Sequence, residues 1–278
     1  MKHLYHALWG ALLGNAILCG LWLAWSLGDS HRQKSTYQVL AEEFTLPATS
    51  SEAAMTAEDP PSLQESSPQE DHPSATSEQQ EPAVTLPAPP RHDLAALQAE
   101  NPDCIGWLTI PHTPVDYPVV WTPSDPEHYL RRDFYGNPAS GGTPFLDGRS
   151  QPQAEGQNLI VYGHNMLDGS MFKPVLQYLV PNFLVTHQDI YLELGGSQYR
   201  YQVVAAVETD SSCPLYSYTD LNSPEKASMF RGALLQATDL DAVHHAPGYL
   251  TLSTCNDQGG NSRVLVVAAL QGEVITEP

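Results

Sequence analysis

The chain has 278 residues, of which 41% are hydrophobic, enough for one well-cored domain with additional segments. Its 12 Lys and Arg residues face 32 Asp and Glu residues, so the formal net charge is −20. A chain with so few cations cannot neutralise a run of phosphates, which excludes nucleic acid as a partner.

The first 28 residues contain a long uncharged stretch. From Ala7 to Leu27 no side chain is charged, and Leu, Ala and Trp are frequent. A helix of that length is about 30 Å long and matches the hydrocarbon core of a bilayer. Residues 1–28 are therefore expected to form an N-terminal membrane anchor or signal segment. A cleaved signal peptide is the alternative, although the apolar run is longer than is usual for one.

The expected anchor also predicts where the protein resides. A first helix near the start of a chain, with one large domain after it, usually leads to export of that domain. We therefore expect a single-pass protein of the cell membrane whose large domain is extracellular.

A disordered spacer is expected over residues 29–90. Residues 41–90 carry ten acidic and no basic side chains, nine prolines, and many Ser, Thr and Gln residues. Such a segment cannot bury enough apolar surface to offset the entropy lost on ordering. As a flexible tether it would give the domain a reach of about 40 Å.

Residues 91–278 have the composition of one globular domain. Asp93 is expected to cap a short helix that ends at Asn101-Pro102. Further helices are expected over residues 170–179 and 223–238. Runs rich in β-branched, Leu and Tyr residues, separated by Gly, Pro, Asn and Asp, predict strands at 105–110, 115–121, 158–162, 189–194, 199–207, 248–255 and 263–270. This pattern predicts a mainly β sandwich or barrel with inserted helices.

Cys255 ends one of the predicted strands. Alternation places Leu250 and Leu252 on one face and Ser253 and Cys255 on the other. The cysteine leaves the sheet beside hydroxyl groups and before a Gly-rich loop, a position suited to access. A buried, inert cysteine is the alternative interpretation.

Arg263 opens the next predicted strand, eight positions after Cys255. If the two strands form a hairpin, the thiol and the guanidinium lie at the same end of neighbouring strands. A permanently charged donor beside a thiol can stabilise a thiolate and the oxyanion of a tetrahedral intermediate.

His164 is the candidate proton carrier. It comes directly after the predicted strand 158–162, and Gly163 lets the backbone bend there. The pair His244-His245 has no third residue at metal-ligand spacing, so no metal site is expected. Asp257 is a weaker candidate for orienting His164, and pairing of Cys104 with Cys213 stays open.

These residues resemble the catalytic signature of sortases, the membrane-anchored cysteine transpeptidases of Gram-positive bacteria. The signature consists of Leu252-Ser253-Thr254-Cys255, the arginine that opens the next strand, and Tyr162-Gly163-His164-Asn165. Class B is indicated by Asn101-Pro102-Asp103, Ile105-Gly106-Trp107-Leu108, Asp116-Tyr117-Pro118-Val119-Val120, Asp133-Phe134-Tyr135-Gly136 and Phe145-Leu146-Asp147. The resemblance covers about residues 92–272.

The resemblance implies a closed β-barrel of about eight strands with catalytic His164, Cys255 and Arg263 and no cofactor. The cysteine would cleave a C-terminal sorting motif of secreted proteins through a thioacyl intermediate. The new C-terminus would be joined to an amine of a peptidoglycan precursor or a pilin. Ser253 and Thr254 are expected to contact the substrate; the alternative for Ser253 is a hydroxyl that only satisfies the barrel rim.

Two other functions are compatible with the same residues. A thiol peptidase would use the same three residues but pass the acyl group to water. A tethered β module without catalytic activity would leave Cys255 as an ordinary thiol.

Overall fold

The computed structural model describes residues 2–47, 88–238, 240, 242–243, 245–256 and 260–275. Within them, eight strands form a closed barrel in the order β1-β2-β3-β4-β7-β8-β6-β5, as expected for the fold class. The strands are β1 (Cys104–Thr109), β2 (Asp116–Val120), β3 (Phe145–Leu146), β4 (Asn158–Tyr162), β5 (Asp189–Leu194), β6 (Ser197–Asp210), β7 (Tyr249–Cys255) and β8 (Ser262–Glu273). The two-residue β3 is the strand that hydrophobic periodicity did not predict.

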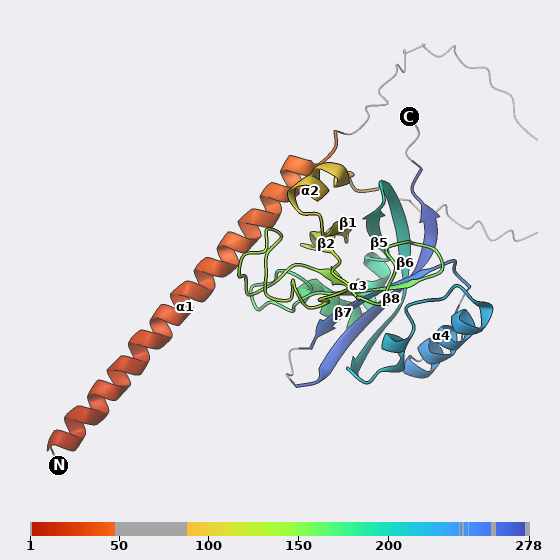
Figure 1. Ribbon diagram of the computed structural model, residues 1–278. Helices are drawn as coiled ribbons and strands as arrows, with labels where there is room; N and C mark the ends of the chain where they lie inside the picture. Colours follow the sequence, from red (N-terminus) through yellow and green to blue (C-terminus); the bar gives the residue numbers. More distant parts are fainter. Residues whose placement is uncertain are drawn as a thin grey trace, which may run out of the picture.

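The barrel wall separates two apolar cores. Leu250 and Leu252 of β7 belong to the core inside the barrel, as their alternation predicts. Leu265 of β8 faces outward and packs with Phe230 and Leu234 of α4 (Pro224–Ala237) in a second core. Figure 1 shows α4 against the outside of the barrel. Strands β7 and β8 are therefore buried on both faces, which rigidifies the part of the wall that ends in Cys255 and Arg263.

Each of the three helices predicted for the domain has a counterpart in the structure. Asp93 caps α2 (Leu94–Glu100) by accepting a hydrogen bond from the Ala96 amide at 2.9 Å. Ser223 caps α4 in the same way, by accepting from the Lys226 amide at 3.2 Å. The helix expected over 170–179 is the 3-10 helix η1 (Lys173–Leu179), which precedes α3 (Pro181–Thr186). A further short 3-10 helix, η2 (Pro214–Ser217), lies before α4.

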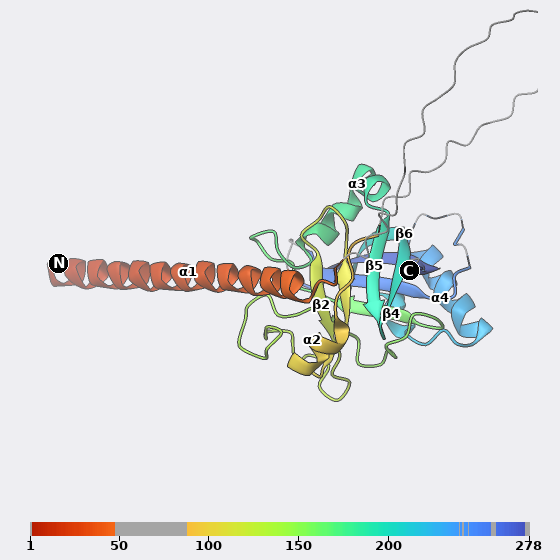
Figure 2. The same ribbon diagram turned by 90° about the horizontal axis from the view of Figure 1, so that it is seen from above.

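The N-terminal helix α1 (Lys2–Phe44) extends far beyond the boundary expected at residue 28. Residues 29–44 are helical, and not the start of a disordered spacer, because one side of this segment is buried. Tyr37 and Leu40 are 3% and 1% exposed and belong to the main apolar core. Counting the charges and prolines of a segment does not reveal this buried face, because its residues are spaced at helical intervals among polar residues. Figure 2 shows α1 meeting the barrel with its C-terminal part.

The expected membrane span stays a prediction. In the described part of the chain, no helix combines the length and the apolar composition that crossing a bilayer requires. The expected span includes residues 7–13, 22, 23, 26 and 27, whose side chains lie outside that part.

The chain returns to the end of α1 after the expected spacer. Thr45 pairs with His92 in an antiparallel bridge, and the Leu46 amide donates to the Arg91 carbonyl at 2.7 Å. Residues 48–87 lie outside the described residues, but the segments on either side of them are joined. The spacer therefore adds no reach between α1 and the barrel, which corrects its expected role as a tether.

A buried contact between His92 and Glu193 fixes this junction to the barrel. His92 Nδ1 lies 2.7 Å from Glu193 Oε1 of β5, and both side chains are 3% exposed. The His92 amide donates to the other oxygen of the same carboxylate at 2.9 Å. The imidazole also stacks on Trp107, with ring centroids 4.0 Å apart. Contacts on three sides hold the returning chain in one place.

Replacing residues 50–86 by a short Gly-Ser linker should leave the melting temperature within a few degrees of wild type. The two ends of the loop already lie together, so a shorter loop reduces the entropic cost of closing it only slightly. Thermal unfolding of the full chain measures this.

Glu193→Ala is the contrasting control, because it removes the buried carboxylate that contacts both the amide and the ring of His92, and it should cost about 1–3 kcal/mol. A large loss of stability on shortening the loop would contradict this prediction and show that residues 50–86 stabilise the folded protein.

Candidate active site

The parallel pairing of β4 with β7 brings His164 and Cys255 to one rim. Tyr162 of β4 is opposite Ser253 of β7, and the candidate residues lie two positions beyond this pair in each strand. The pairing continues past β4, since the Gly163 amide donates to the Ser253 carbonyl at 3.1 Å. The Asn165 side-chain amide then donates to the carbonyl of Cys255 at 3.1 Å.

The antiparallel pairing of β7 with β8 adds the arginine. Cys255 and Arg263 are direct partners at the last position of the ladder, as the expected hairpin requires. The guanidinium Nη1 donates to the Ser262 carbonyl at 2.9 Å. The loop residue Asp257 lies outside the described residues, so its expected role is untested. The thiol, the imidazole and the guanidinium therefore lie at the same rim, at the ends of three adjacent strands.

One nitrogen of His164 is committed to a backbone acceptor. Nε2 lies 2.8 Å from the Leu130 carbonyl oxygen, which can only accept, so Nε2 carries a proton. In the neutral ring Nδ1 is then the nitrogen with the free lone pair. Gly163 lets Phe172 pack against this strand end, because a β-carbon at position 163 would lie 2.5 Å from the Phe172 ring. The glycine is therefore required for close packing, and its φ does not lie in the left-handed region.

The surroundings of His164 favour the neutral imidazole. Burial lowers its pKa below the usual 6.5, and the positive charge of Arg131 lowers it further. The hydrogen bond to Leu130 acts in the opposite direction and offsets part of the decrease. At neutral pH the ring can therefore accept a proton, as a general base must.

The four cysteines differ in access. Cys255 and Cys19 are exposed, whereas Cys104 and Cys213 are buried, and all four are free. Burial raises the pKa of Cys104 to about 12. Cys104 belongs to the core inside the barrel and Cys213 to the core outside it, so the open question of their pairing is answered: they form no disulfide.

The two expected substrate contacts lie deeper than Cys255. Ser253 is 2% exposed, and its hydroxyl lies 2.8 Å from the Tyr216 hydroxyl. Thr254 is also buried, and its hydroxyl has no hydrogen-bond partner among the described residues. This burial favours the alternative in which Ser253 satisfies the barrel rim. Its direct contact with substrate stays a prediction that requires the Tyr216 bond to open.

Tyr216 is a site residue that the sequence analysis missed. It lies in η2 and stacks on Tyr162 with ring centroids 6.2 Å apart. Burial raises the pKa of Tyr216, the Ser253 bond lowers it, and the charge of Arg263 lowers it as well. The phenol is therefore close enough to the arginine to interact with it electrostatically. No periodic pattern marks Tyr216, because it belongs to a short irregular segment.

An ion pair holds Tyr216 and Tyr162 together. Arg149 donates twice to Asp147, at 2.9 and 2.7 Å, and once to the Tyr216 carbonyl at 2.8 Å. The same carboxylate accepts from the Tyr162 hydroxyl at 2.9 Å. Burial opposes ionisation of Asp147, but the bonds from Arg149 and Tyr162 outweigh it and lower the pKa. The acid stays charged and fixes this side of the rim.

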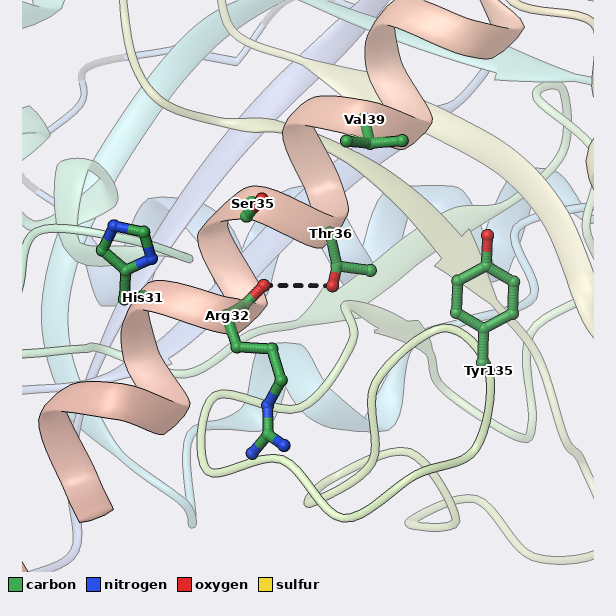
Figure 3. Close-up of a pocket in the computed structure, with 6 residues that line it drawn as sticks. All are labelled: His31, Arg32, Ser35, Thr36, Val39 and Tyr135. Carbon is green, nitrogen blue, oxygen red and sulfur yellow. Dashed lines mark hydrogen bonds between the residues drawn. The ribbon is translucent and has the colours of Figure 1, made fainter.

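Two other features of the described residues lie apart from this chemistry. No cluster of three or more potential metal ligands occurs among them. A shallow cavity of about 390 Å³ is lined by α1 and by Tyr135 (Figure 3). It contains none of His164, Cys255 and Arg263, so it is separate from the candidate active site.

The family is settled by comparison with known proteins. A sortase-domain family model matches residues 108–271. The chain belongs to the sortase family. It is 32% identical over 194 residues to sortase B of Listeria monocytogenes, covering 67% of this chain and 76% of that protein. These relationships place it in class B.

Solved structures agree with this class. A Staphylococcus aureus sortase B–substrate complex superposes with a TM-score of 0.58 at 26% identity, covering 64% of this chain and 84% of the other. A Bacillus anthracis protein described as similar to sortase B gives 0.57 at 28% identity, covering 66% and 83%. This sortase is accordingly a cysteine transpeptidase that acts in anchoring surface proteins to the cell wall. A β module without catalytic activity is ruled out.

Arg131→Gln should raise the pKa of His164 in this sortase. The change removes a positive charge that disfavours the imidazolium and leaves the Leu130 carbonyl in place. An NMR titration of the His164 ring measures the shift. Arg132→Gln is the matched control and should cause a smaller change, because the Arg132 guanidinium donates to the Gly136 carbonyl at 3.1 Å. Equal shifts in both variants would contradict the assignment.

Proposed function

We propose that Cys255, His164 and Arg263 carry out the transpeptidation. The observation that carries the proposal is their placement at one rim: Cys255 opposite Arg263 in the ladder, and His164 at the matching end of the adjacent parallel strand. Exposure of Cys255 supports its role as the nucleophile, since a substrate carbonyl can approach the sulfur.

In the first half of the reaction, neutral His164 takes the proton of the Cys255 thiol, and the resulting thiolate attacks the carbonyl carbon of the scissile amide. A carbon–sulfur bond forms, the carbon–nitrogen bond breaks, and protonated His164 donates its proton to the leaving amine. Arg263 donates hydrogen bonds to the oxyanion or to the substrate backbone. In the second half, an acceptor amine attacks the thioester, His164 takes its proton, and the thiolate leaves.

The substrate that this site fits is a C-terminal sorting motif of a secreted protein. Similarity to a sortase B–substrate complex supports a peptide substrate. The acceptor is an amine of a peptidoglycan precursor or of a pilin, because the thioester reacts readily with amines. Transfer to water is the competing outcome, that of a thiol peptidase.

We also propose that residues 7–27 anchor the enzyme in the cell membrane with the barrel outside. The uncharged length of this run supports the proposal. The helix that contains the run continues without a break to Phe44 and packs on the barrel. The active site would then be held at a fixed distance from the membrane surface, and not on a flexible tether.

A peptide-library cleavage assay on the full-length protein tests the activity and the motif together. It is run with and without added amine nucleophiles of the wall-precursor type. Amide-linked products would support transpeptidation. Recovery of hydrolysed peptide alone, with every amine tried, would favour the thiol peptidase.

Iodoacetamide should label Cys255 in preference to Cys104 and Cys213. The last two thiols are 1% and 6% exposed, and burial disfavours the Cys104 thiolate. Peptide mass spectrometry of the folded protein measures the rates. Cys255→Ala and His164→Ala should each reduce turnover by about a thousandfold or more. Equal labelling of the three cysteines, with activity retained in Cys255→Ala, would remove Cys255 as the nucleophile.

Arg263→Lys separates charge from geometry at the same site. Lysine keeps the positive charge but lacks the planar fork of donors, so we expect kcat to fall by about 100-fold. Steady-state kinetics on the best peptide from the library measure this. Arg200→Lys on β6, at a surface ion pair of 3.9 Å, is the control and should leave kcat unchanged. A near-normal rate in Arg263→Lys would show that charge alone suffices.

A further inference from the structure

One face of α1 carries polar side chains that point into the barrel domain. Asp29, Gln33 and Tyr37 recur every four residues, and Ser30 and Lys34 form the adjacent row. The first three are only 2%, 6% and 3% exposed. A helix face that buries polar groups must satisfy them with specific partners.

The first set of partners is the loop at residues 140–142. Asp29 accepts from the amide and the hydroxyl of Ser140, at 2.9 and 2.7 Å. Gln33 accepts from the Gly141 amide at 3.1 Å and donates to the Gly142 carbonyl at 2.7 Å. The Tyr37 hydroxyl also donates to this carbonyl at 2.9 Å. Five hydrogen bonds from three helix residues therefore fix this loop.

Gly142 lies directly against the carbonyl that holds His164. Its φ is +60°, and a β-carbon at this position would lie 2.4 Å from the Leu130 oxygen. That oxygen accepts the Nε2–H of His164 at 2.8 Å. The neighbouring Thr143 amide donates to the Tyr129 carbonyl at 3.1 Å, which ties the two backbone segments together. The loop that α1 binds therefore lies directly against the Leu130 carbonyl, which accepts the hydrogen bond from His164.

A second loop joins His164 to the same helix face. The Lys34 ammonium donates to the Asp168 carbonyl at 2.9 Å and lies 3.2 Å from its carboxylate, which Ser30 also contacts. Burial opposes ionisation of Asp168, but its hydrogen bonds outweigh this effect and lower the pKa to about 2. The loop closes on the histidine, because the Phe172 amide donates to the His164 carbonyl at 2.8 Å.

We infer that residues 29–37 of α1 are a positioning element for the catalytic histidine. By fixing both loops that contact His164, they hold the Leu130 carbonyl against Nε2 and so keep Nδ1 as the proton-accepting nitrogen. The inference rests on the proposed function of His164 for its effect on turnover, but its effect on the ring itself does not depend on that function.

The test compares Gln33→Leu, Tyr37→Phe and the double variant in the full-length protein. Gln38→Leu is the matched control: the same substitution on the same helix at an exposed residue. Histidine ¹⁵N NMR reports the tautomer of His164, and kinetics on the best library peptide report kcat and KM separately. Melting temperature confirms that each variant is folded.

The double variant should lose the uniform Nε2–H tautomer and lower kcat about tenfold, with KM within about twofold, because a misplaced proton carrier slows the chemical step. Gln38→Leu should match wild type in both measurements. If the double variant fails to fold, Tyr37→Phe decides alone, because it removes one hydroxyl and no packing volume. A wild-type tautomer and kcat in every folded variant would overturn the inference.

His164→Ala separates this inference from the proposed function. Retained turnover in His164→Ala would reject the proposed role of the histidine. The tautomer measurement on Gln33→Leu and Tyr37→Phe would still decide whether α1 positions the ring.

Discussion

The parallel pairing of β4 with β7 is the interaction on which the active site depends. Parallel neighbours end at the same rim, so the residues just beyond Tyr162 and Ser253 meet there although they are distant in the chain. An antiparallel pairing would place His164 and Cys255 at opposite ends of the barrel. A slip of one residue would turn Cys255 toward the barrel interior. The hairpin to β8 then adds Arg263 at the same rim.

Burial on both faces keeps this register fixed. Leu250 and Leu252 fill the barrel, while Leu265 and Val267 of β8 pack outward under α4. A strand with apolar contacts on both sides cannot shift without exposing one set or burying polar groups. The exposed Cys255 is the end of an otherwise buried strand, where an accessible thiol rests on a rigid support.

The helix α1 connects three parts of the molecule that the chain order separates. Its C-terminal part packs against the main apolar core, meets the returning chain at Thr45, and binds the two loops that contact His164. The composition of residues 48–87 is therefore unrelated to the distance between α1 and the barrel. If residues 7–27 cross the membrane as proposed, the same continuous helix links that anchor to the proton carrier.

Sequence patterns were enough to predict seven of the eight barrel strands, the caps at Asp93 and Ser223, and the candidate residues Cys255, Arg263 and His164. Each of these has a local signal: period-two alternation, a capping side chain, or a reactive group at the end of a strand. Local signals suffice where neighbouring residues decide the structure.

The remaining features depend on contacts made in the folded protein. The helix beyond residue 28, the junction of Thr45 with His92, the Tyr216 contact and the bond from His164 to Leu130 all join residues far apart in the chain. The polar composition of residues 29–38 hid the helical face at Gln33 and Tyr37, because burial of this face depends on partners supplied by the loop at residues 140–143. Contacts between distant segments carry no local pattern, so the folded barrel alone specifies them.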